Sequence, residues 1–231
     1  MDAMPQENTI PAAPMLALRD VEVAIDKAPI LRGISFAVEP GEMVALIGRN
    51  GAGKTTTLRA IMGLLCVQRG EISVQGEIAS SRPAHLRAGL GIGYMPEDRR
   101  LIPHFTVEEN ILMPSWLVDI PDLRASLQEV YDLIPEIAPL AKLPALSLSG
   151  GQQKLVALGR ALLVGRRMLL LDEPFEGVAP ALVERLQEIM ARLSAGNERT
   201  VLVCDSSLSE SHGHYDRHLF IERGQVSSRL A

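Results

Sequence analysis

The feature that most constrains the fold of this 231-residue chain is one continuous stretch, residues 44–58. It opens with four apolar residues, Val44 to Ile47, as expected for a buried strand of a parallel sheet. Gly48-x-x-x-x-Gly53-Lys54-Thr55 follows directly, and the chain then takes a helical pattern. Glycines let successive backbone N–H groups turn toward one anion, and the start of a helix adds positive charge. The stretch therefore predicts a strand–loop–helix unit that binds phosphate groups.

Within this loop, backbone and side chains have separate predicted roles. The Lys54 ammonium supplies a point charge to the β- and γ-phosphates of a nucleotide, and the Thr55 hydroxyl can ligate Mg²⁺. We expect a bound nucleotide to contact the whole segment, which consists of Gly48, Arg49, Asn50, Gly51, Ala52, Gly53, Lys54, Thr55 and Thr56.

A second apolar run ends in two acids. Leu169 to Leu171 precede Asp172 and Glu173, so a buried strand would carry two carboxylates out at its carboxyl end. Asp172 can hold Mg²⁺ through water and complete the metal shell begun by Thr55, while Glu173 can orient or deprotonate an attacking water. Beside a phosphate-binding loop, this pair predicts a site that hydrolyses a nucleotide.

Composition narrows the classes of protein. The chain is 47% apolar and 22% charged, which suits one globular α/β domain. A net charge of −5 argues against a nucleic-acid groove, and an aromatic content of 3% argues against a base-stacking surface. Cys66 and Cys204 lie far apart in apolar stretches, so we expect buried thiols and no disulfide. We also expect no membrane-spanning helix and no signal peptide.

The rest of the pattern alternates strands with helices. We expect a loose tail over residues 1–14 and a mainly helical insert over about 82–160, in which Thr106-x-x-Glu109 predicts a helix-capping box. Apolar residues at helical spacing predict helices over 55–65, 122–134 and 180–194, and a further helix that opens in residues 148–154 and runs to about 164. Predicted strands cover 15–25, 30–38, 44–47, 71–74, 77–78, 89–95, 167–171, 200–203 and the hairpin 219–226.

The order of four motifs resembles that of ABC transporter ATPase subunits. The phosphate-binding loop, a Pro96-Glu97 loop, Leu148-Ser149-Gly150-Gly151-Gln152 and Leu171-Asp172-Glu173-Pro174 follow one another within residues 16–226. The loop over 93–110 is further similar to the branch that serves branched-chain amino acid (LivF-like) or urea importers. The resemblance implies an α/β fold over residues 15–231. This fold would be a P-loop NTPase core of ABC-ATPase type, with an N-terminal antiparallel β subdomain and an inserted α-helical subdomain.

The resemblance also implies partners and cofactors. Two cassettes, alike or different, would pair head to tail around two ATP molecules, each ATP meeting Ser149, Gly150, Gly151 and Gln152 of the opposite subunit. Glu97 would contact the nucleotide and its Mg²⁺, and the surface near residues 97–113 would receive a short helix of the permease. The chain would sit at the cytoplasmic face of the cell membrane through that permease. A periplasmic or extracellular solute-binding protein would be an indirect partner, and nucleic acid would be none.

Three positions depart from the commoner family pattern: Ile25, Ser206 and Glu97, which stands where many cassettes have Gln although this branch often has Glu. Ile25 stands where the family has an aromatic residue that stacks on adenine, so we expect weaker nucleotide affinity. Ser206 stands where the family presents a His or Gln to the γ-phosphate, which predicts slow hydrolysis unless Ser206 acts through a bridging water. His212-x-His214 lacks a third metal ligand and is expected to be solvated.

Three functions therefore stay open. They are the ATPase subunit of an importer, a low-activity nucleotide-binding partner of a second active cassette, and a non-transport ABC ATPase. Intact Lys54, Asp172 and Glu173 favour the first over the second. Cassettes without a transport role usually carry long inserts or basic extensions, which this chain lacks. The transported solute is not encoded in this chain, since specificity resides in the binding protein and the permease.

Overall fold

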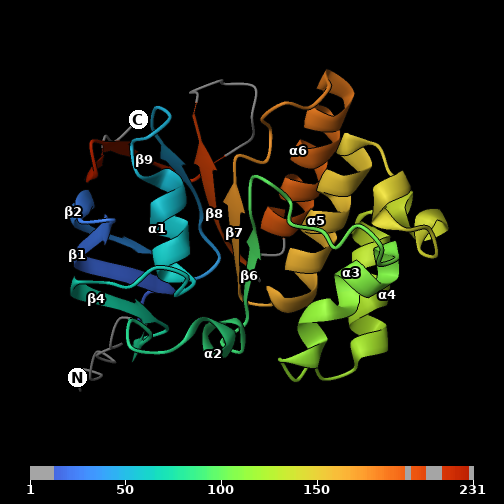
Figure 1. The fold of residues 1–231 in the computed structure, drawn as a ribbon, viewed down its shortest axis with the longest axis horizontal. Helices are drawn as coiled ribbons and strands as arrows, with labels where there is room; N and C mark the ends of the chain where they lie inside the picture. The colour runs from blue at the N-terminus through green and yellow to red at the C-terminus, as the bar shows by residue number, and fades with distance from the viewer. Residues whose placement is uncertain (1–12, 196–198, 207–214, 229–231) are drawn as a thin grey trace, which may run out of the picture.

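The computed structural model describes residues 13–195, 199–206 and 215–228, and Figure 1 shows how their elements are arranged. A small antiparallel sheet has the strand order β2-β1-β4-β5. Its strands are β1 (Leu16–Ile25), β2 (Ala28–Val38), β4 (Arg69–Val74) and β5 (Glu77–Ile78). This is the N-terminal antiparallel β subdomain that the sequence predicted.

The larger sheet has the strand order β10-β9-β3-β8-β7-β6. Its strands are β3 (Met43–Ile47), β6 (Ile92–Met95), β7 (Met168–Asp172), β8 (Thr200–Asp205), β9 (Arg217–Glu222) and β10 (Gln225–Ser228). All neighbouring pairs are parallel except β9 and β10, which form the predicted terminal hairpin. Because β3, β7 and β8 are adjacent and parallel, their carboxyl ends meet at one edge of the sheet, where ligands commonly bind.

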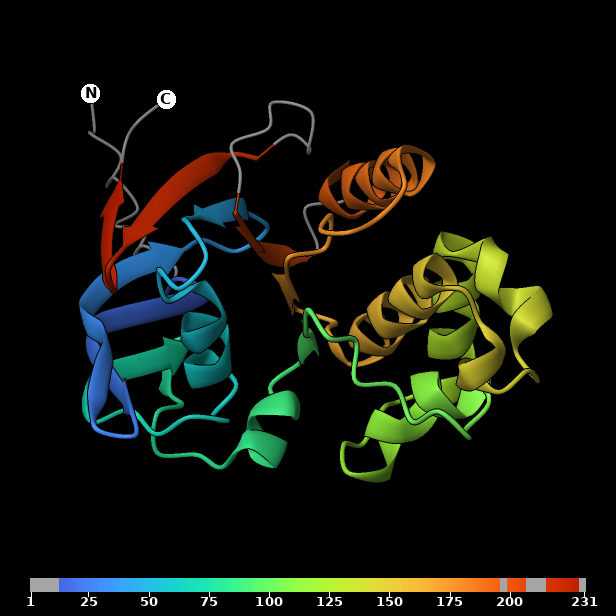
Figure 2. The same cartoon turned by 45° about the horizontal axis from the view of Figure 1, so that its top comes forward.

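Helices cover both faces of this central sheet (Figures 1 and 2). On one side lies α1 (Lys54–Ile61) with the antiparallel sheet, and on the other lie α5 (Gly150–Val164) and α6 (Pro180–Ala195). Successive side chains of β7 enter different cores: Met168 and Leu170 pack on the α1 side, whereas Leu169 and Leu171 pack on the α5 side. A strand buried on both faces needs such a continuous apolar run.

The remaining helices are α2 (Ala84–Ala88), α3 (Val107–Leu112) and α4 (Leu123–Leu133). Three short 3-10 helices lie in the proline-containing connections: η1 (Met113–Trp116), η2 (Pro135–Leu140) and η3 (Ala145–Ser147). The predicted capping box is confirmed, because Thr106 accepts a hydrogen bond from the Glu109 N–H while Glu109 accepts one from the Thr106 N–H. The expected helical insert over 82–160 also contains β6, which pairs with β7 in the central sheet.

Several element boundaries differ from the sequence expectation. Helix α1 ends at Ile61 instead of Leu65, because Gly63 takes a left-handed conformation with φ 73°. Strand β6 starts at Ile92, since Gly91 has φ 82° and lies in a turn. Cys66 is exposed, so the expectation of two buried thiols was wrong for it and right for Cys204.

Buried Arg87 explains why short α2, which the sequence did not predict, stays attached to α1. Its guanidinium donates hydrogen bonds to the carbonyls of Ala60 and Ile61 at 2.7 and 2.8 Å, at the end of α1. Nε donates to the carbonyl of Arg82 at 2.8 Å, on the approach to α2. Charged donors satisfy the last carbonyls of a helix and complement its dipole. In the part of the chain that the structure describes, no helix has the length and apolar character needed to cross a bilayer.

Candidate nucleotide-binding site

The phosphate-binding loop connects β3 to α1, and its glycines allow a turn that other residues would block. A Cβ on Gly48 would lie 2.3 Å from the carbonyl oxygen of Ile221, and Gly53 has φ 116°. Gly53 is also the N-cap of α1 and has no side chain to cap it. The first N–H groups of a helix lack intrahelical partners, so they remain available for an anion.

Lys54 and Glu173 meet below this loop. The Lys54 Nζ lies 3.0 Å from Glu173 Oε1, and each side chain is 5% exposed. Nζ also donates to the carbonyl of Gly48 at 2.5 Å. Burial raises the pKa of the Glu173 carboxyl, while the hydrogen bond and charge of Lys54 act to lower it. The structure thus joins two of the three predicted catalytic residues, Lys54 of α1 and Glu173 directly after β7.

Asp172 ends β7 beside the first turn of α1. The Thr55 hydroxyl donates to Asp172 Oδ1 at 3.1 Å, and the Tyr94 hydroxyl donates to Oδ2 at 3.3 Å. Asp172 is fully buried, and burial raises its pKa to about 6 although both hydrogen bonds act to lower it. A buried carboxylate of this kind is stabilised by a nearby cation.

These residues fit Mg²⁺. The Thr55 hydroxyl and the Asp172 carboxylate are hard oxygen ligands of the type that Mg²⁺ prefers, and the structure places them next to each other. Within the described residues, no group of three or more His, Cys, Asp or Glu side chains is placed to hold a metal ion, so this site would need oxygen ligands from the nucleotide or water. His212 and His214 lie outside the described residues.

A cavity of about 410 Å³ lies over the loop. Glu97 and Glu173 both border it, which brings the Pro96-Glu97 loop to the same cavity as one of the two predicted catalytic acids. Its other lining residues are Ile30, Asn50, Gly51, Gly53, Lys54, Thr55, Thr56 and Glu176. The size and the loop backbone suit the phosphate groups of a nucleotide. Ile30 and Glu176 were not predicted, because their position depends on how β2 and the turn after β7 pack.

Ile25 and Ser206, which were named for their departure from the family pattern, do not line the 410 Å³ cavity. Ile25 is 38% exposed at the end of β1 and is not among the residues that line the 410 Å³ cavity. Ser206 borders a second cavity of about 730 Å³ on the other side of the loop, together with Gly48 and Arg49. Its backbone N–H, not its hydroxyl, donates to Glu173 Oε2 at 3.1 Å.

The segment Ser149 to Gln152 begins α5 and faces outward. Ser149 caps the helix by accepting from the Gln152 N–H, while Gln152 Oε1 accepts from the Ser149 N–H at 2.9 Å. Ser149 and Gly150 are exposed, and none of the four residues lines the cavity over the loop. The Arg99 guanidinium lies against this turn and donates to Gln153 Oε1 at 3.2 Å. This segment is therefore not part of the cavity over the loop of its own chain.

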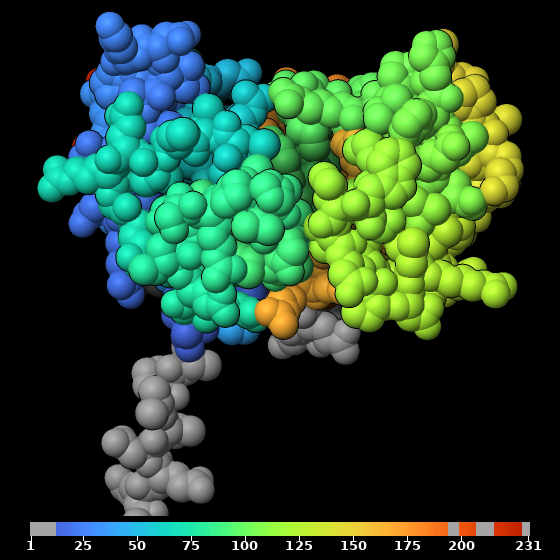
Figure 3. All heavy atoms as spheres, turned by 60° about the horizontal axis from the view of Figure 1, so that its bottom comes forward, coloured from blue at the N-terminus to red at the C-terminus, as the bar shows by residue number. Residues whose placement is uncertain are grey.

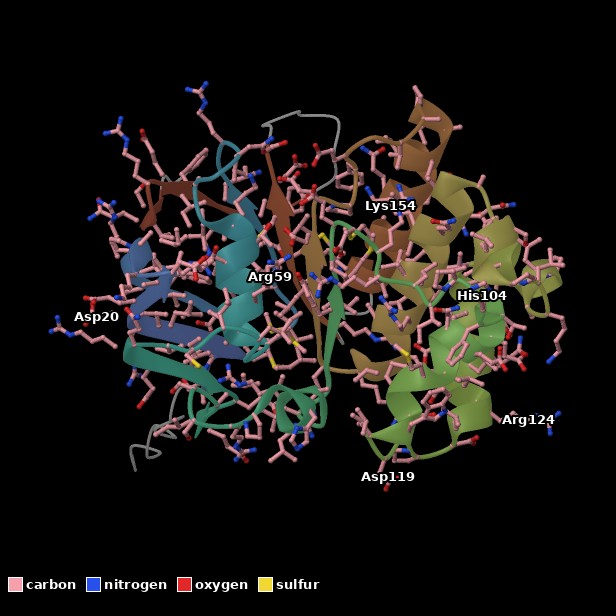
Figure 4. The ribbon with its side chains drawn as sticks, viewed as in Figure 1. Asp20, Arg59, His104, Asp119, Arg124 and Lys154 are labelled. Atoms are coloured by element: carbon pink, nitrogen blue, oxygen red, sulfur yellow. The ribbon has the colours of Figure 1, made fainter. Side chains whose placement is uncertain are left out.

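Tyr94 is a site residue that the motifs did not reveal. Parallel pairing of β6 with β7 sets Tyr94 opposite Leu170, which brings its hydroxyl to Asp172. Burial raises the Tyr94 pKa, so its hydroxyl stays protonated and keeps donating. A lone hydroxyl in an otherwise apolar strand was the available signal. Figure 4 shows Arg59 of α1 directed toward these central strands.

Comparisons with known proteins agree with this geometry. A family model described as "ABC transporter" matches residues 31–176, a range that contains both the phosphate-binding loop and the acid pair. An uncharacterized ABC transporter ATP-binding protein of Rhizobium meliloti is 37% identical over 201 residues, covering 85% of this chain and 73% of that protein. The high-affinity branched-chain amino acid transport ATP-binding protein BraG of Pseudomonas aeruginosa is 33% identical over 212 residues, covering 92% and 91%.

A relative that is named for a different transport role is equally similar to this chain. The lipopolysaccharide export system ATP-binding protein LptB of Acidithiobacillus ferridurans is 34% identical over 198 residues, covering 85% of this chain and 82% of that protein. Among solved structures, a dimeric ATP-binding cassette with bound ADP and Pi superposes with a TM-score of 0.82 at 22% identity, covering 94% of this chain and 100% of the other. The last comparison confirms the predicted fold.

Proposed function

The chain belongs to the ABC transporter family as an ATP-binding, ATP-hydrolysing subunit, and from that premise we propose that it powers the import of branched-chain amino acids or a related small polar solute. The likeness to BraG over 91% of its length supports this substrate class. Because an export ATPase is equally similar, the direction of transport and the solute are part of the proposal.

One observation carries the catalytic part of the proposal: the buried Lys54–Glu173 pair lies beside the Thr55–Asp172 contact under one cavity. Lys54 and the N–H groups at the start of α1 bind the β- and γ-phosphates. Thr55 and Asp172 would hold Mg²⁺, and the bound ion would supply positive charge to the phosphoryl oxygens. Glu97 also lines this cavity and would contact the nucleotide and its Mg²⁺.

Glu173 acts on the attacking water. Its carboxylate takes the water proton or holds the water in line with the γ-phosphate, a role that suits a pKa raised by burial. A phosphate that draws the Lys54 ammonium toward itself releases Oε1 for this task, while the Ser206 N–H holds Oε2 at 3.1 Å. ATP binding would thereby prepare the base as well as the substrate.

The cassettes would act in pairs. The outward position of Ser149 and Gly150 supports a head-to-tail dimer in which this turn contacts the nucleotide of the partner cassette. Two identical chains and two different chains both satisfy this arrangement. Binding of ATP between the subunits would close the dimer, and hydrolysis would open it.

The permease would dock on the helical part near residues 97–113, and the chain would lie at the cytoplasmic face of the membrane through that contact. Figure 3 shows the whole helical part in green to yellow, beside the blue-green segment that precedes it. Residues 97–113 belong to its green portion. Trp116 and Leu117, which follow α3, are 63% and 78% exposed. The centroids of the Trp116 and Phe105 rings lie 5.8 Å apart. Large exposed apolar side chains next to the expected docking surface support a protein partner there.

A reduced-activity cassette is the second candidate. It is favoured by the position of Ile25 outside the cavity and by the Ser206 hydroxyl, which is not the group that contacts Glu173. Steady-state ATP hydrolysis by the purified chain separates the two candidates. We expect measurable hydrolysis that is abolished in Glu173→Gln. Retained Mg-ATP binding without hydrolysis would favour the reduced-activity candidate.

The transport role is tested in cells. Deletion of this gene from its host should lower uptake of radiolabelled leucine, isoleucine and valine. Re-expression of the wild-type chain should restore uptake, whereas the Glu173→Gln chain, matched in expression, should not. Unchanged uptake of all three amino acids after deletion would contradict the proposed substrate class.

A further inference from the structure

Lys154 is a buried lysine that none of the motifs includes. It lies in the first turns of α5 and is 2% exposed. Its Nζ donates one hydrogen bond to the carbonyl of Glu173 at 2.9 Å and another to the carbonyl of Glu176 at 2.8 Å. Figure 4 shows Lys154 on α5, toward the end of the central strands where β7 finishes. The ammonium thus links α5 to the turn that carries the proposed catalytic base.

This turn is short and needs outside support. The Glu176 N–H donates to the Glu173 carbonyl at 3.2 Å and closes the turn directly after β7. Glu173 itself has φ 48°, a left-handed conformation that costs about 1–2 kcal/mol for a residue with a Cβ. Such conformations persist only where surrounding contacts impose them.

The contacts that impose the conformation of Glu173 come from several elements. Its N–H donates to the Cys204 carbonyl at 3.0 Å, and its two carboxylate oxygens meet Lys54 and the Ser206 N–H. Its carbonyl is the group that Lys154 holds. A nucleotide that recruits Lys54 would remove one of these contacts, which leaves the backbone contacts to keep the carboxylate in place.

A buried ammonium is a costly way to fill space, since desolvation of a charged group disfavours folding. The carboxylates of Glu176, Glu173 and Glu97 favour the charged form of Lys154, while Arg99 and burial disfavour it. A methionine would fill a similar volume without that cost. We therefore attribute the presence of a lysine at position 154 to the two hydrogen bonds that its ammonium donates.

We propose that Lys154 is a positioning residue for ATP hydrolysis, which holds the Glu173–Glu176 turn and thereby keeps the Glu173 carboxylate directed at the attacking water. This inference rests on the proposed role of Glu173 as base. Lys154 is not among the residues that line the 410 Å³ cavity, so we expect its substitution to act on kcat and not on the Kd for Mg-ATP.

Two substitutions separate hydrogen bonding from packing. Lys154→Met keeps most of the length and apolar volume but removes every donor. Lys154→Gln is one atom shorter and uncharged, yet its amide can donate two hydrogen bonds. For each purified variant we would measure kcat for ATP hydrolysis, the Kd for Mg-ATP, and amide hydrogen exchange over residues 173–177.

We expect Lys154→Met to lower kcat about tenfold or more, because a misplaced base loses transition-state stabilisation. Its Kd for Mg-ATP should stay within about threefold of wild type, since ground-state contacts are intact. Lys154→Gln should recover most of kcat. Amide exchange over 173–177 should accelerate in the methionine variant and change less in the glutamine variant.

Arg87→Met provides the matched control, because Arg87 is also a buried cation that donates to backbone carbonyls, but at the far end of α1. It should lose stability without accelerated exchange at 173–177 and without a selective fall in kcat. Equal loss of kcat in both methionine variants, in proportion to their stability, would assign Lys154 a structural role and overturn the proposal. So would unchanged kcat and exchange in Lys154→Met.

These experiments distinguish failure of the proposed function from failure of the inference about Lys154. If the wild-type chain neither binds nor hydrolyses Mg-ATP, the proposed function falls. Amide exchange then still decides whether Lys154 holds the turn, because that measurement does not depend on activity. If the wild type hydrolyses ATP and Lys154→Met matches it, the inference about Lys154 falls alone.

Discussion

Lys54 and Glu173 neutralise each other: the Nζ and Oε1 atoms are 3.0 Å apart, and both side chains are almost completely buried. Each of the two groups has a second proposed task, since Lys54 binds phosphate and Glu173 acts on water. A phosphate at the loop must compete with the carboxylate for the same ammonium. The ion pair therefore opposes nucleotide binding at the same time as it holds the base in position.

Glu173→Gln should separate these effects. The neutral amide holds Lys54 more weakly, so we expect Mg-ATP affinity to rise severalfold while hydrolysis falls by about a hundredfold or more. Equilibrium binding of a fluorescent ATP analogue and single-turnover hydrolysis would measure the two. Glu188→Gln serves as the control, because Glu188 is exposed on α6 and pairs with Arg185. A variant that still hydrolyses ATP at the wild-type rate would remove Glu173 from the mechanism.

Asp172→Asn should stabilise the metal-free chain above pH 6. The Asp172 pKa of about 6 lies above its ordinary value of 3.8, so the unfolded chain loses this proton at lower pH than the folded chain does. The resulting penalty grows between pH 4 and pH 6 and is complete above it. Removal of the charge should add about 1–3 kcal/mol to the free energy of unfolding at pH 7.5.

Urea unfolding of both chains in EDTA, at pH 4 and pH 7.5, would measure this effect. The gain should be much smaller at pH 4, where Asp172 is protonated in the folded chain and only partly ionised in the unfolded chain. The same variant should lose the Mg²⁺ dependence of nucleotide binding. Equal stability of the two chains at pH 7.5 would show that the carboxylate carries no burial penalty.

Local patterns in the sequence identified most of this site. The glycines of the loop, the capping box at Thr106 and the acids after an apolar run each express their structure within a few residues. The contact between Thr55 and Asp172 followed from one further assumption, that both strands are parallel members of one sheet. That assumption is correct, because β8 lies between β3 and β7 and pairs with each.

The residues that were missed depend on packing between distant segments. Lys154 belongs to α5, yet its ammonium reaches a turn 19 residues further along the chain. Tyr94 reaches Asp172 only because β6 sits at the edge next to β7. No local spacing encodes either distance. The range predicted for the helical insert, about 82–160, was also too wide, because the short apolar strand β6 within it joins the central sheet.

The stability of the chain should depend on pH through Lys154. Burial and the neighbouring Arg99 lower its pKa to about 8 from 10.5, against the opposing effect of Glu176, Glu173 and Glu97. Between pH 8 and pH 10.5 the unfolded chain binds more protons at this position, so the free energy of unfolding should rise with pH. The contribution is up to about 3 kcal/mol.

Comparison of wild type with Lys154→Met isolates this contribution from other groups that titrate at high pH. The difference in free energy of unfolding between the two chains should shift in favour of wild type as pH increases from 8 to 10. Arg87→Met again provides the control, because a guanidinium does not titrate in this range. A difference that is constant with pH would mean that Lys154 keeps an ordinary pKa.

Ser206→His should accelerate hydrolysis. Ser206 follows β8, is exposed, and borders the 730 Å³ cavity next to Gly48 and Arg49, so a larger side chain has room there. The contact with Glu173 comes from the Ser206 backbone N–H and survives any change of side chain except proline. An imidazole at this position adds a donor that reaches further toward the γ-phosphate, and we expect kcat to rise about tenfold.

Ser206→Ala is the companion variant, because it tells whether the present hydroxyl acts through a bridging water. If the hydroxyl is idle, the alanine chain should match wild type in kcat while the histidine chain exceeds both. A fall in kcat for alanine, with no rise for histidine, would instead assign the serine a water-mediated role and contradict the expectation of slow hydrolysis. Since both variants keep the backbone N–H that holds Glu173 Oε2, any difference between them reports the side chain alone.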